Sequence, residues 1–302
     1  MISKKTVLVL GAGASKPYGY PLQNEFKKEI LGKLQDKNMR STLTEVHGFS
    51  EFVIDNFFSS FNLSGSKYIE EFLTERKEFL EIGKLVITDV IKEHENLEAL
   101  FKEESWYVYL FNIMKDSFED FGKNKLSIIT FNFDVSIEAF FFNALKNSYN
   151  KSEQEIYKQL EKIPILHMYG RIGNIPTEGI IREIPYGKNT LCRPSVEETR
   201  GINILSEKDI IFDAVVKRAH STLKEAEVII FLGFGYDDVN MRRLNIVGLE
   251  EKKIIGSTFG IMSGEIKSII KKSNNKVSLG KTKLVQALDV KDFLKESGAL
   301  LL

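Results

Sequence analysis

The stretch that decides the fold is TVLVLGAGASKPYGYP, residues 6–21. Its aliphatic run Val7–Leu10 is short, continuous and bounded by glycine, as expected for a strand that is buried on both faces of a parallel sheet. Gly11 and Gly13 follow at once, so the backbone can turn tightly and approach a ligand without obstruction by a Cβ atom. A helix is expected from Leu22 onward, and its N-terminal amides would favour a phosphate. The stretch therefore indicates a nucleotide-binding loop or, alternatively, a tight turn between strand and helix.

The same strand signal recurs along the chain and predicts an α/β fold. Short aliphatic runs predict further strands at Leu126–Thr130, Pro164–Met168, Val228–Leu232, Lys253–Ile255 and Thr282–Val285. Apolar residues at helical spacing predict helices at Val135–Leu145, Ile210–Leu223, Gly264–Ile270 and Val290–Glu296. Because strands and helices alternate, we expect a Rossmann-like parallel sheet in a single domain that spans residues 1–302.

Two regions interrupt this alternation. Residues 22–122 contain amphipathic helical patterns and no convincing strand. We therefore expect a large helical insertion after the first strand, forming a subdomain. Residues 170–207 contain Pro176, Pro185 and Pro194, which predict a long loop or flap.

Composition narrows the classes of function. Lys plus Arg and Asp plus Glu both number 42, so the formal net charge is zero, and we predict no direct binding to nucleic acid. The single cysteine, Cys192, supplies no disulfide framework. No apolar run approaches the ~20 residues that cross a bilayer, and the run Val7–Leu10 is too short for the core of a secretory signal. We expect a cytoplasmic protein that does not associate with membranes, and no metal site, because the four histidines show no ligand spacing.

Polar residues and glycines recur where the predicted strands end, which is where ligands bind in open α/β sheets. The candidates are Asn132 and Asp134 after the second strand, His167 and Tyr169 after the third, Gly233 after the fourth, and Gly256 and Ser257 after the fifth. Each also has a structural interpretation: Asp134 as a helix cap, for example, or His167 as a core histidine. Their joint placement after successive strands indicates one site.

These residues resemble the motifs of the sirtuin family. GAGAS (residues 11–15) resembles the sirtuin phosphate loop G-A-G-x-S, and TFNFD (residues 130–134) resembles the Thr-Gln-Asn-x-Asp segment that surrounds the nicotinamide ribose. ILHMYG (residues 165–170) resembles the strand that carries the catalytic histidine. FLGFGYDDVN (residues 231–240) is similar to a phrase common in bacterial sirtuin-like proteins of anti-phage defence.

The chain also departs from the sirtuin deacylases. One cysteine cannot supply their four-cysteine zinc module, and Phe131 replaces the glutamine before the family's asparagine. Tyr169 stands directly before the glycine, where deacylases carry the histidine, and His167 lies two residues earlier. On an extended strand both side chains would point to the same face, so either could act as the base. His167 is favoured because imidazole titrates near neutral pH. The departures point to the defence branch of the family, whose members destroy NAD⁺.

The resemblance implies an NAD⁺ glycohydrolase that cleaves the nicotinamide–ribose bond to give nicotinamide and ADP-ribose. It implies that NAD⁺ is the substrate and that the protein depletes NAD in abortive infection, with an activating protein partner from the same defence system and assembly into a homo-oligomer. The alternatives are an NAD-dependent protein deacylase or ADP-ribosyltransferase, and a non-catalytic sensor that binds NAD or ADP-ribose.

The resemblance also assigns roles to the candidate residues. Asn132 would hold the ribose hydroxyls or the attacking water, Asp134 would recognise the carboxamide or brace the loop, and His167 would be the general base. The expected cofactor contacts are Gly11, Ala12, Gly13, Ser15, Tyr169, Gly233, Gly256 and Ser257.

Overall fold

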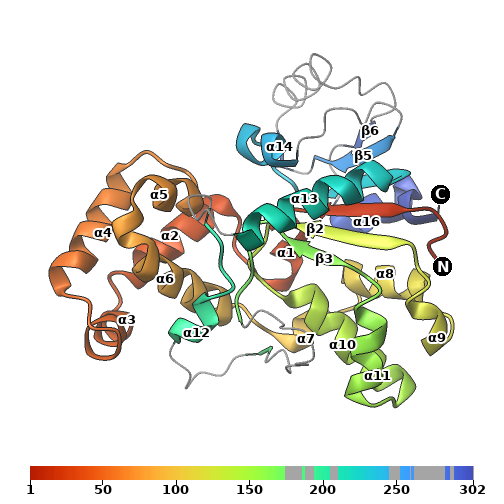
Figure 1. Ribbon diagram of the computed structural model, residues 1–302, viewed down its shortest axis with the longest axis horizontal. Coiled ribbons are helices and arrows are strands. Elements are labelled where there is room, and N and C mark those ends of the chain that lie inside the picture. The colour runs from red at the N-terminus through yellow and green to blue at the C-terminus, as the bar shows by residue number, and fades with distance from the viewer. Residues whose placement is uncertain are drawn as a thin grey trace.

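The computed structural model describes residues 1–173, 186–187, 194–204, 210–244, 252–258, 260–261, 283–285 and 289–301. In these residues, six strands form one parallel sheet: β1 (Thr6–Leu10), β2 (Leu126–Thr130), β3 (Ile165–His167), β4 (Val228–Leu232), β5 (Lys253–Ser257) and β6 (Lys283–Val285). Their order is β3-β2-β1-β4-β5-β6 (Figure 1). This is the strand order of doubly wound dinucleotide-binding sheets, so the predicted Rossmann-like α/β class is confirmed.

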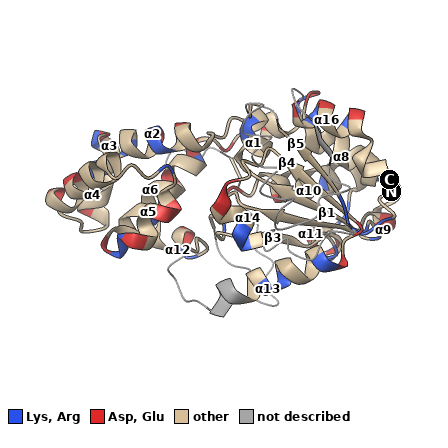
Figure 2. Ribbon diagram, turned by 90° about the horizontal axis from the view of Figure 1, so that it is seen from above, with Lys and Arg blue, Asp and Glu red and all other residues tan. Residues whose placement is uncertain are grey.

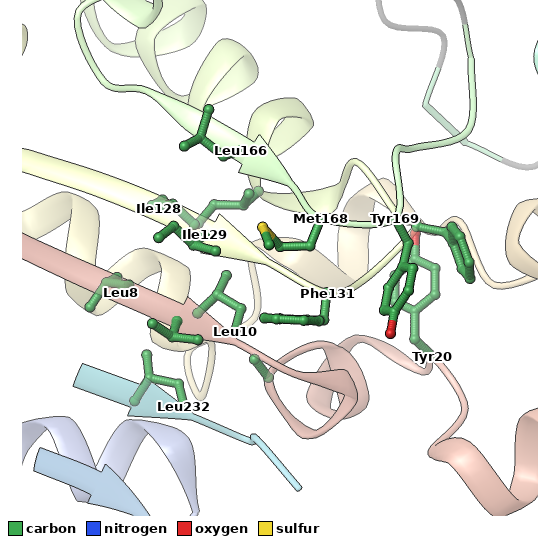
Figure 3. Close-up of a cluster of buried hydrophobic side chains, with 14 of the residues drawn as sticks. Leu8, Leu10, Tyr20, Ile128, Ile129, Phe131, Leu166, Met168, Tyr169 and Leu232 are labelled. Atoms are coloured by element: carbon green, nitrogen blue, oxygen red, sulfur yellow. The ribbon is translucent and has the colours of Figure 1, made fainter. Parts of the chain in front are cut away.

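The centre of the sheet is buried because helices cover both of its faces. Every residue of β1 and β4 is buried, which explains why their sequences are continuously apolar rather than alternating. Helix α13 (Ile210–Glu225) lies over one face, and α8 (Trp106–Met114), α10 (Ser136–Tyr149) and α16 (Val290–Ser297) lie over the other (Figure 1). Figure 3 shows the aliphatic side chains of β1–β3 packed along the sheet, with Phe131 and Tyr169 beyond the carboxyl ends of their strands.

The regular elements of the described chain between β1 and β2 are all helices, as the sequence predicts. Its elements are α1 (Ala12–Ser15), η1 (Lys16–Tyr18), α2 (Gln23–Lys33), α3 (Lys37–Ser41), η2 (Thr42–Val46), α4 (Glu51–Leu63), α5 (Ile69–Glu75), η3 (Lys77–Phe79), α6 (Leu80–Glu93), α7 (Leu97–Leu100), α8 and α9 (Phe118–Phe121). Helices α2–α6 form a lobe to one side of the sheet, which we call the insertion lobe, whereas α7 and α8 pack against α10 (Figure 1). That residues 22–122 form a subdomain stays a prediction.

The remaining elements are α11 (Glu153–Leu160), α12 (Val196–Thr199), α14 (Asp238–Leu244) and η4 (Ala299–Leu301). Helix α12 lies inside the predicted loop 170–207 and was not expected there. It forms because Ser195 and Glu198 make reciprocal side-chain to backbone hydrogen bonds, a capping box. The rest of that predicted loop, residues 174–185, 188–193 and 205–207, and the predicted helix Gly264–Ile270 lie outside the described residues.

Acidic and basic residues are interspersed along the ribbon of the insertion lobe and of the sheet domain (Figure 2), in keeping with the zero formal charge. Among the described helices, none combines the length and the apolar character that a membrane span requires.

Candidate functional site

The glycine loop after β1 and the loop after β4 pack backbone against backbone. The amide of Gly11 donates to the carbonyl of Leu232 at 3.1 Å, and the amide of Gly13 donates to the carbonyl of Gly233 at 2.9 Å. A Cβ atom on Gly11 would lie 2.6 Å from the Gly233 oxygen, and one on Gly233 would lie 2.1 Å from the Ala14 nitrogen. These glycines are therefore required for the two loops to approach each other. Because the amides of Gly11 and Gly13 are already paired, their part in a phosphate cradle stays a prediction.

Three predicted site residues from two distant motifs meet where β1 and β2 end. The side-chain amide of Asn132 donates to the Gly11 carbonyl at 3.1 Å and to Ser15 Oγ at 3.0 Å. The Ser15 hydroxyl in turn donates to Asp134 Oδ2 at 2.9 Å. The Asn132 amide is thus held in a fixed orientation at the carboxyl edge of the sheet.

Asp134 is buried, and both of its carboxylate oxygens accept hydrogen bonds. Its Oδ1 accepts hydrogen bonds from the amide of Ser136, at 3.2 Å, and from the Ser136 hydroxyl. The Tyr107 hydroxyl lies 2.7 Å from that same Ser136 oxygen. Burial raises the pKa of Asp134, while the hydrogen bonds from Ser136 and Ser15 oppose the rise. Asp134 therefore braces the start of α10 and the glycine loop at once.

His167 is held by hydrogen bonds at both ring nitrogens. Its Nδ1 lies 3.0 Å from the main-chain oxygen of Asn132, and its Nε2 lies 2.7 Å from Glu138 Oε1. Arg171 donates to that same carboxylate oxygen at 3.3 Å. Burial favours a raised pKa for Glu138, but the charges of His167 and Arg171 outweigh it and hold the pKa below its usual value. The sequence analysis missed Glu138. It lies four residues after Asp134, in the first turn of α10, and this spacing was the feature of the sequence that could have marked it as a site residue.

Tyr169 contacts different residues from His167. Its hydroxyl donates to Asn240 Oδ1 at 2.6 Å, and the Arg243 guanidinium lies 4.5 Å from the centre of its ring. The expectation that His167 and Tyr169 share a face assumed an extended strand, whereas the regular strand ends at His167 and the chain turns at Gly170, whose φ is +70°. Which of the two is the base stays a prediction. The phenol ring packs edge-on against Phe131, with centroids 5.8 Å apart (Figure 3).

Gly256 and Ser257 are the last residues of β5 and not a turn after it, so the sequence boundary at Ile255 was two residues short. Ser257 Oγ accepts a hydrogen bond from the Gly233 amide at 3.0 Å, and the Tyr236 hydroxyl donates to the Ser257 carbonyl at 3.1 Å. In this structure Ser257 thus secures the loop after β4. A contact with the ribose or base stays a prediction.

A partly open pocket lies at this edge of the sheet. It is lined by Ala12, Ser15, Tyr20, Pro21, Gln23, Phe26, Glu70, Ile91, Phe131, Asn132, Phe133 and Asp134. Four predicted site residues, Ala12, Ser15, Asn132 and Asp134, thus line one pocket. The other seven are not among the described residues that line it: Gly11, Gly13, His167, Tyr169, Gly233, Gly256 and Ser257.

The sequence analysis missed two polar residues of the pocket wall, Gln23 and Glu70, which come from α2 and α5 of the insertion lobe. A charged residue in an amphipathic helix normally indicates a solvated face. The spacing could have predicted that Glu70 is buried, because Glu70 lies three residues before the buried Leu73 and so on the same face of α5.

Comparison with known proteins gives structural neighbours alone. No protein-family model and no curated protein matches the chain. A solved structure of a Sir2 homologue in complex with NAD matches with 14% identity over 99% of this chain and 92% of that chain, at a TM-score of 0.46. A Sir2 structure with the inhibitor EX-527, 2'-O-acetyl-ADP-ribose and a deacetylated p53 peptide matches with 16% identity over 97% of this chain and 94% of that chain, at a TM-score of 0.42. Similarity at this level assigns neither a ligand nor a reaction to this chain.

Proposed function

We propose that this protein is an NAD⁺ glycohydrolase, which cleaves the nicotinamide–ribose bond to nicotinamide and ADP-ribose. One observation carries the proposal: the Asn132 amide is fixed by Ser15 and Gly11 in a pocket at the carboxyl ends of β1 and β2. Dinucleotides bind at this edge of doubly wound sheets. The resemblance of residues 11–15 and 130–134 to sirtuin motifs supports the same ligand.

The reaction places modest chemical demands on the protein. The transition state is oxocarbenium-like, as in other glycosidic cleavages. The leaving nicotinamide is already cationic, so it departs with the bonding electron pair and becomes neutral without being protonated. A water oxygen forms the new bond to the ribose carbon and releases one proton. The protein therefore has to orient the ribose, exclude bulk water and position one water molecule.

The proposed roles follow from the contacts. Asn132 orients the ribose hydroxyls or the attacking water, and Asp134 holds Ser15 so that the Asn132 amide stays in place. His167 stays the proposed base. Both of its ring nitrogens are hydrogen-bonded in this structure, so the role requires Nε2 to leave the Glu138 carboxylate when the substrate binds. Burial raises the pKa of the Tyr169 phenol, which makes Tyr169 a poor base at neutral pH.

The biological setting is a further part of the proposal. An unregulated NAD⁺ hydrolase would deplete its own cell, so we infer that activity is gated by a protein partner or by self-assembly. The resemblance to defence proteins favours NAD depletion during anti-phage abortive infection as the role.

The test is nicotinamide release from NAD⁺ by the purified chain over a range of protein concentrations. Asn132→Ala is expected to lower release at least about 100-fold while the protein stays folded. Asn147→Ala, on the exposed face of α10, is the matched control and should behave as wild type. Equal release by Asn132→Ala would contradict the site. Thermal stabilisation by NAD⁺ without release would favour the sensor alternative, and neither release nor binding at any concentration would overturn the proposal.

A further inference from the structure

Glu70 is a buried carboxyl group that the insertion lobe contributes to the pocket of Asn132. Its side chain lines the same pocket as Asn132 and Asp134, and the residue is only 7% exposed. Among the described residues, no hydrogen-bond partner reaches its Oε2 atom. Asp134 differs in this respect, because both of its oxygens accept hydrogen bonds from serine residues. Glu70 is thus the carboxyl group of this pocket that has capacity left for a ligand.

The surroundings of Glu70 stabilise its charge only in part. Burial raises the pKa of Glu70 to about 7, and the nearby acidic residues Asp237 and Glu71 add to the rise, while hydrogen bonds from its own amide and from the Gln23 side chain oppose it. The charge of Glu70 also acts on the pKa of two neighbouring groups: the phenol of Tyr169 and the guanidinium of Arg243, which lies over the Tyr169 ring. A buried carboxylate with an unsatisfied oxygen is unfavourable, and a bound cation would remove that penalty.

The other walls of the pocket suit a flat ring. Four aromatic side chains contribute to them: Tyr20, Phe26, Phe131 and Phe133. The faces of aromatic rings attract cations, and they also pack well against planar groups. A buried carboxyl group with one unpartnered oxygen and several aromatic rings in one pocket together match a planar, positively charged heterocycle.

We propose that Glu70 is a specificity-determining residue that recognises the positive charge of a pyridinium ring, so that the pocket selects the cationic nicotinamide ring over a neutral one. This inference rests on the proposed function, because the oxidised dinucleotide carries that ring. It goes beyond the proposed function by giving the insertion lobe a direct part in substrate selection.

The test compares two small probes that lack the scissile bond to ribose. 1-Methylnicotinamide carries the ring, the carboxamide and a permanent positive charge, whereas nicotinamide carries the same ring and carboxamide without the charge. Titration calorimetry of the full chain should show that wild type prefers the cation by about tenfold. Glu70→Gln, which keeps the shape and removes the charge, should bind the two probes equally and bind nicotinamide as wild type does.

Two further variants test whether the preference for the cation depends on a negative charge at position 70 in particular. Glu70→Asp keeps the charge and should keep part of the preference. Glu75→Gln, which changes an exposed carboxylate on the same helix, should keep all of it. Thermal melts of each variant establish that the protein is folded.

The inference and the proposed function fail separately. Nicotinamide release from NAD⁺ together with an undiminished cation preference in Glu70→Gln would overturn the role of Glu70 and leave the hydrolase standing. No release, with a preference that disappears in Glu70→Gln, would support the cation site and count against the hydrolase. Equal binding of both probes by wild type, or binding of neither, would overturn the inference.

Discussion

The imidazole Nε2 of His167 lies 2.7 Å from Glu138 Oε1, and both side chains are buried. The other ring nitrogen contacts the main-chain oxygen of Asn132, which can only accept, so Nδ1 carries a proton. A hydrogen bond between His167 Nε2 and Glu138 Oε1 then requires one further proton, carried by one of these two atoms. The pair ties α10 to the backbone of the residue whose side chain is central to the candidate site.

Removing one member of this pair should therefore destabilise the fold. Glu138→Gln is expected to lower the free energy of unfolding at pH 7 by about 3 kcal/mol, because it leaves His167 and Arg171 without their carboxylate. The pKa of Glu138 is depressed in the folded chain, so its contribution is present above the ordinary value of 4.5 and is lost as the pH falls through the lower folded value. Urea unfolding at pH 7 and in acid measures both effects.

The double variant Glu138→Gln/His167→Gln is the control for this coupling. Its loss of stability should be smaller than the sum of the two single losses, since each single variant already breaks the contact. Strictly additive losses would show that the two side chains do not act as a pair.

Of the two glycines in the loop after β4, only Gly233 should be sensitive to replacement by alanine. Gly233 has a φ of +54°, and an added Cβ atom would lie 2.1 Å from the Ala14 nitrogen and 2.2 Å from the Gly13 carbonyl carbon. Gly233→Ala should therefore cost about 3 kcal/mol or more and separate the two loops. Gly235→Ala is the matched control, because a Cβ atom added there would meet no other atom within 4 Å. Thermal denaturation of both variants is the measurement, and equal melting temperatures would contradict the packing argument.

Part of the site could be predicted from sequence because it follows from sheet topology. Leu10 pairs with Thr130 in register, so the residues just after them must be neighbours once the strands are recognised as adjacent and parallel. For that reason the meeting of Ser15, Asn132 and Asp134 was accessible from short motifs.

The rest depended on tertiary structure that no local pattern encodes. The contacts of Tyr169 could not be predicted because β3 ends two residues before it, and strand ends are poorly defined by sequence. Glu70 lines the pocket only because the insertion lobe brings α5 near the residues that follow β1 and β2, and an amphipathic pattern does not specify which surface a helix meets.

Ser15 should matter more for activity than for stability. Its hydroxyl accepts from the Asn132 amide and donates to Asp134, so Ser15→Ala removes two contacts that orient Asn132. We expect the free energy of unfolding to fall by about 1 kcal/mol, and nicotinamide release from NAD⁺ to fall by about tenfold or more. Ser148→Ala, at an exposed position of α10, is the control. If nicotinamide release by Ser15→Ala fell only in proportion to the fraction of folded protein, Ser15 would have no role in orienting Asn132.

Glu70 should make the ligand-free protein less stable as the pH rises. Burial raises its pKa from the ordinary 4.5 to about 7, so the folded chain retains this proton more tightly than the unfolded chain. Its stabilising contribution is complete below pH 4.5 and is lost as the pH rises through 7, a difference of about 3 kcal/mol. Glu70→Gln, which cannot ionise, should therefore gain stability relative to wild type between pH 5 and pH 8 in urea unfolding. Glu75→Gln, which alters an exposed carboxylate, should show no such gain. Parallel pH profiles for Glu70→Gln and wild type would mean that the Glu70 carboxylate is already compensated in the folded chain, and that it is not held ready for a cation.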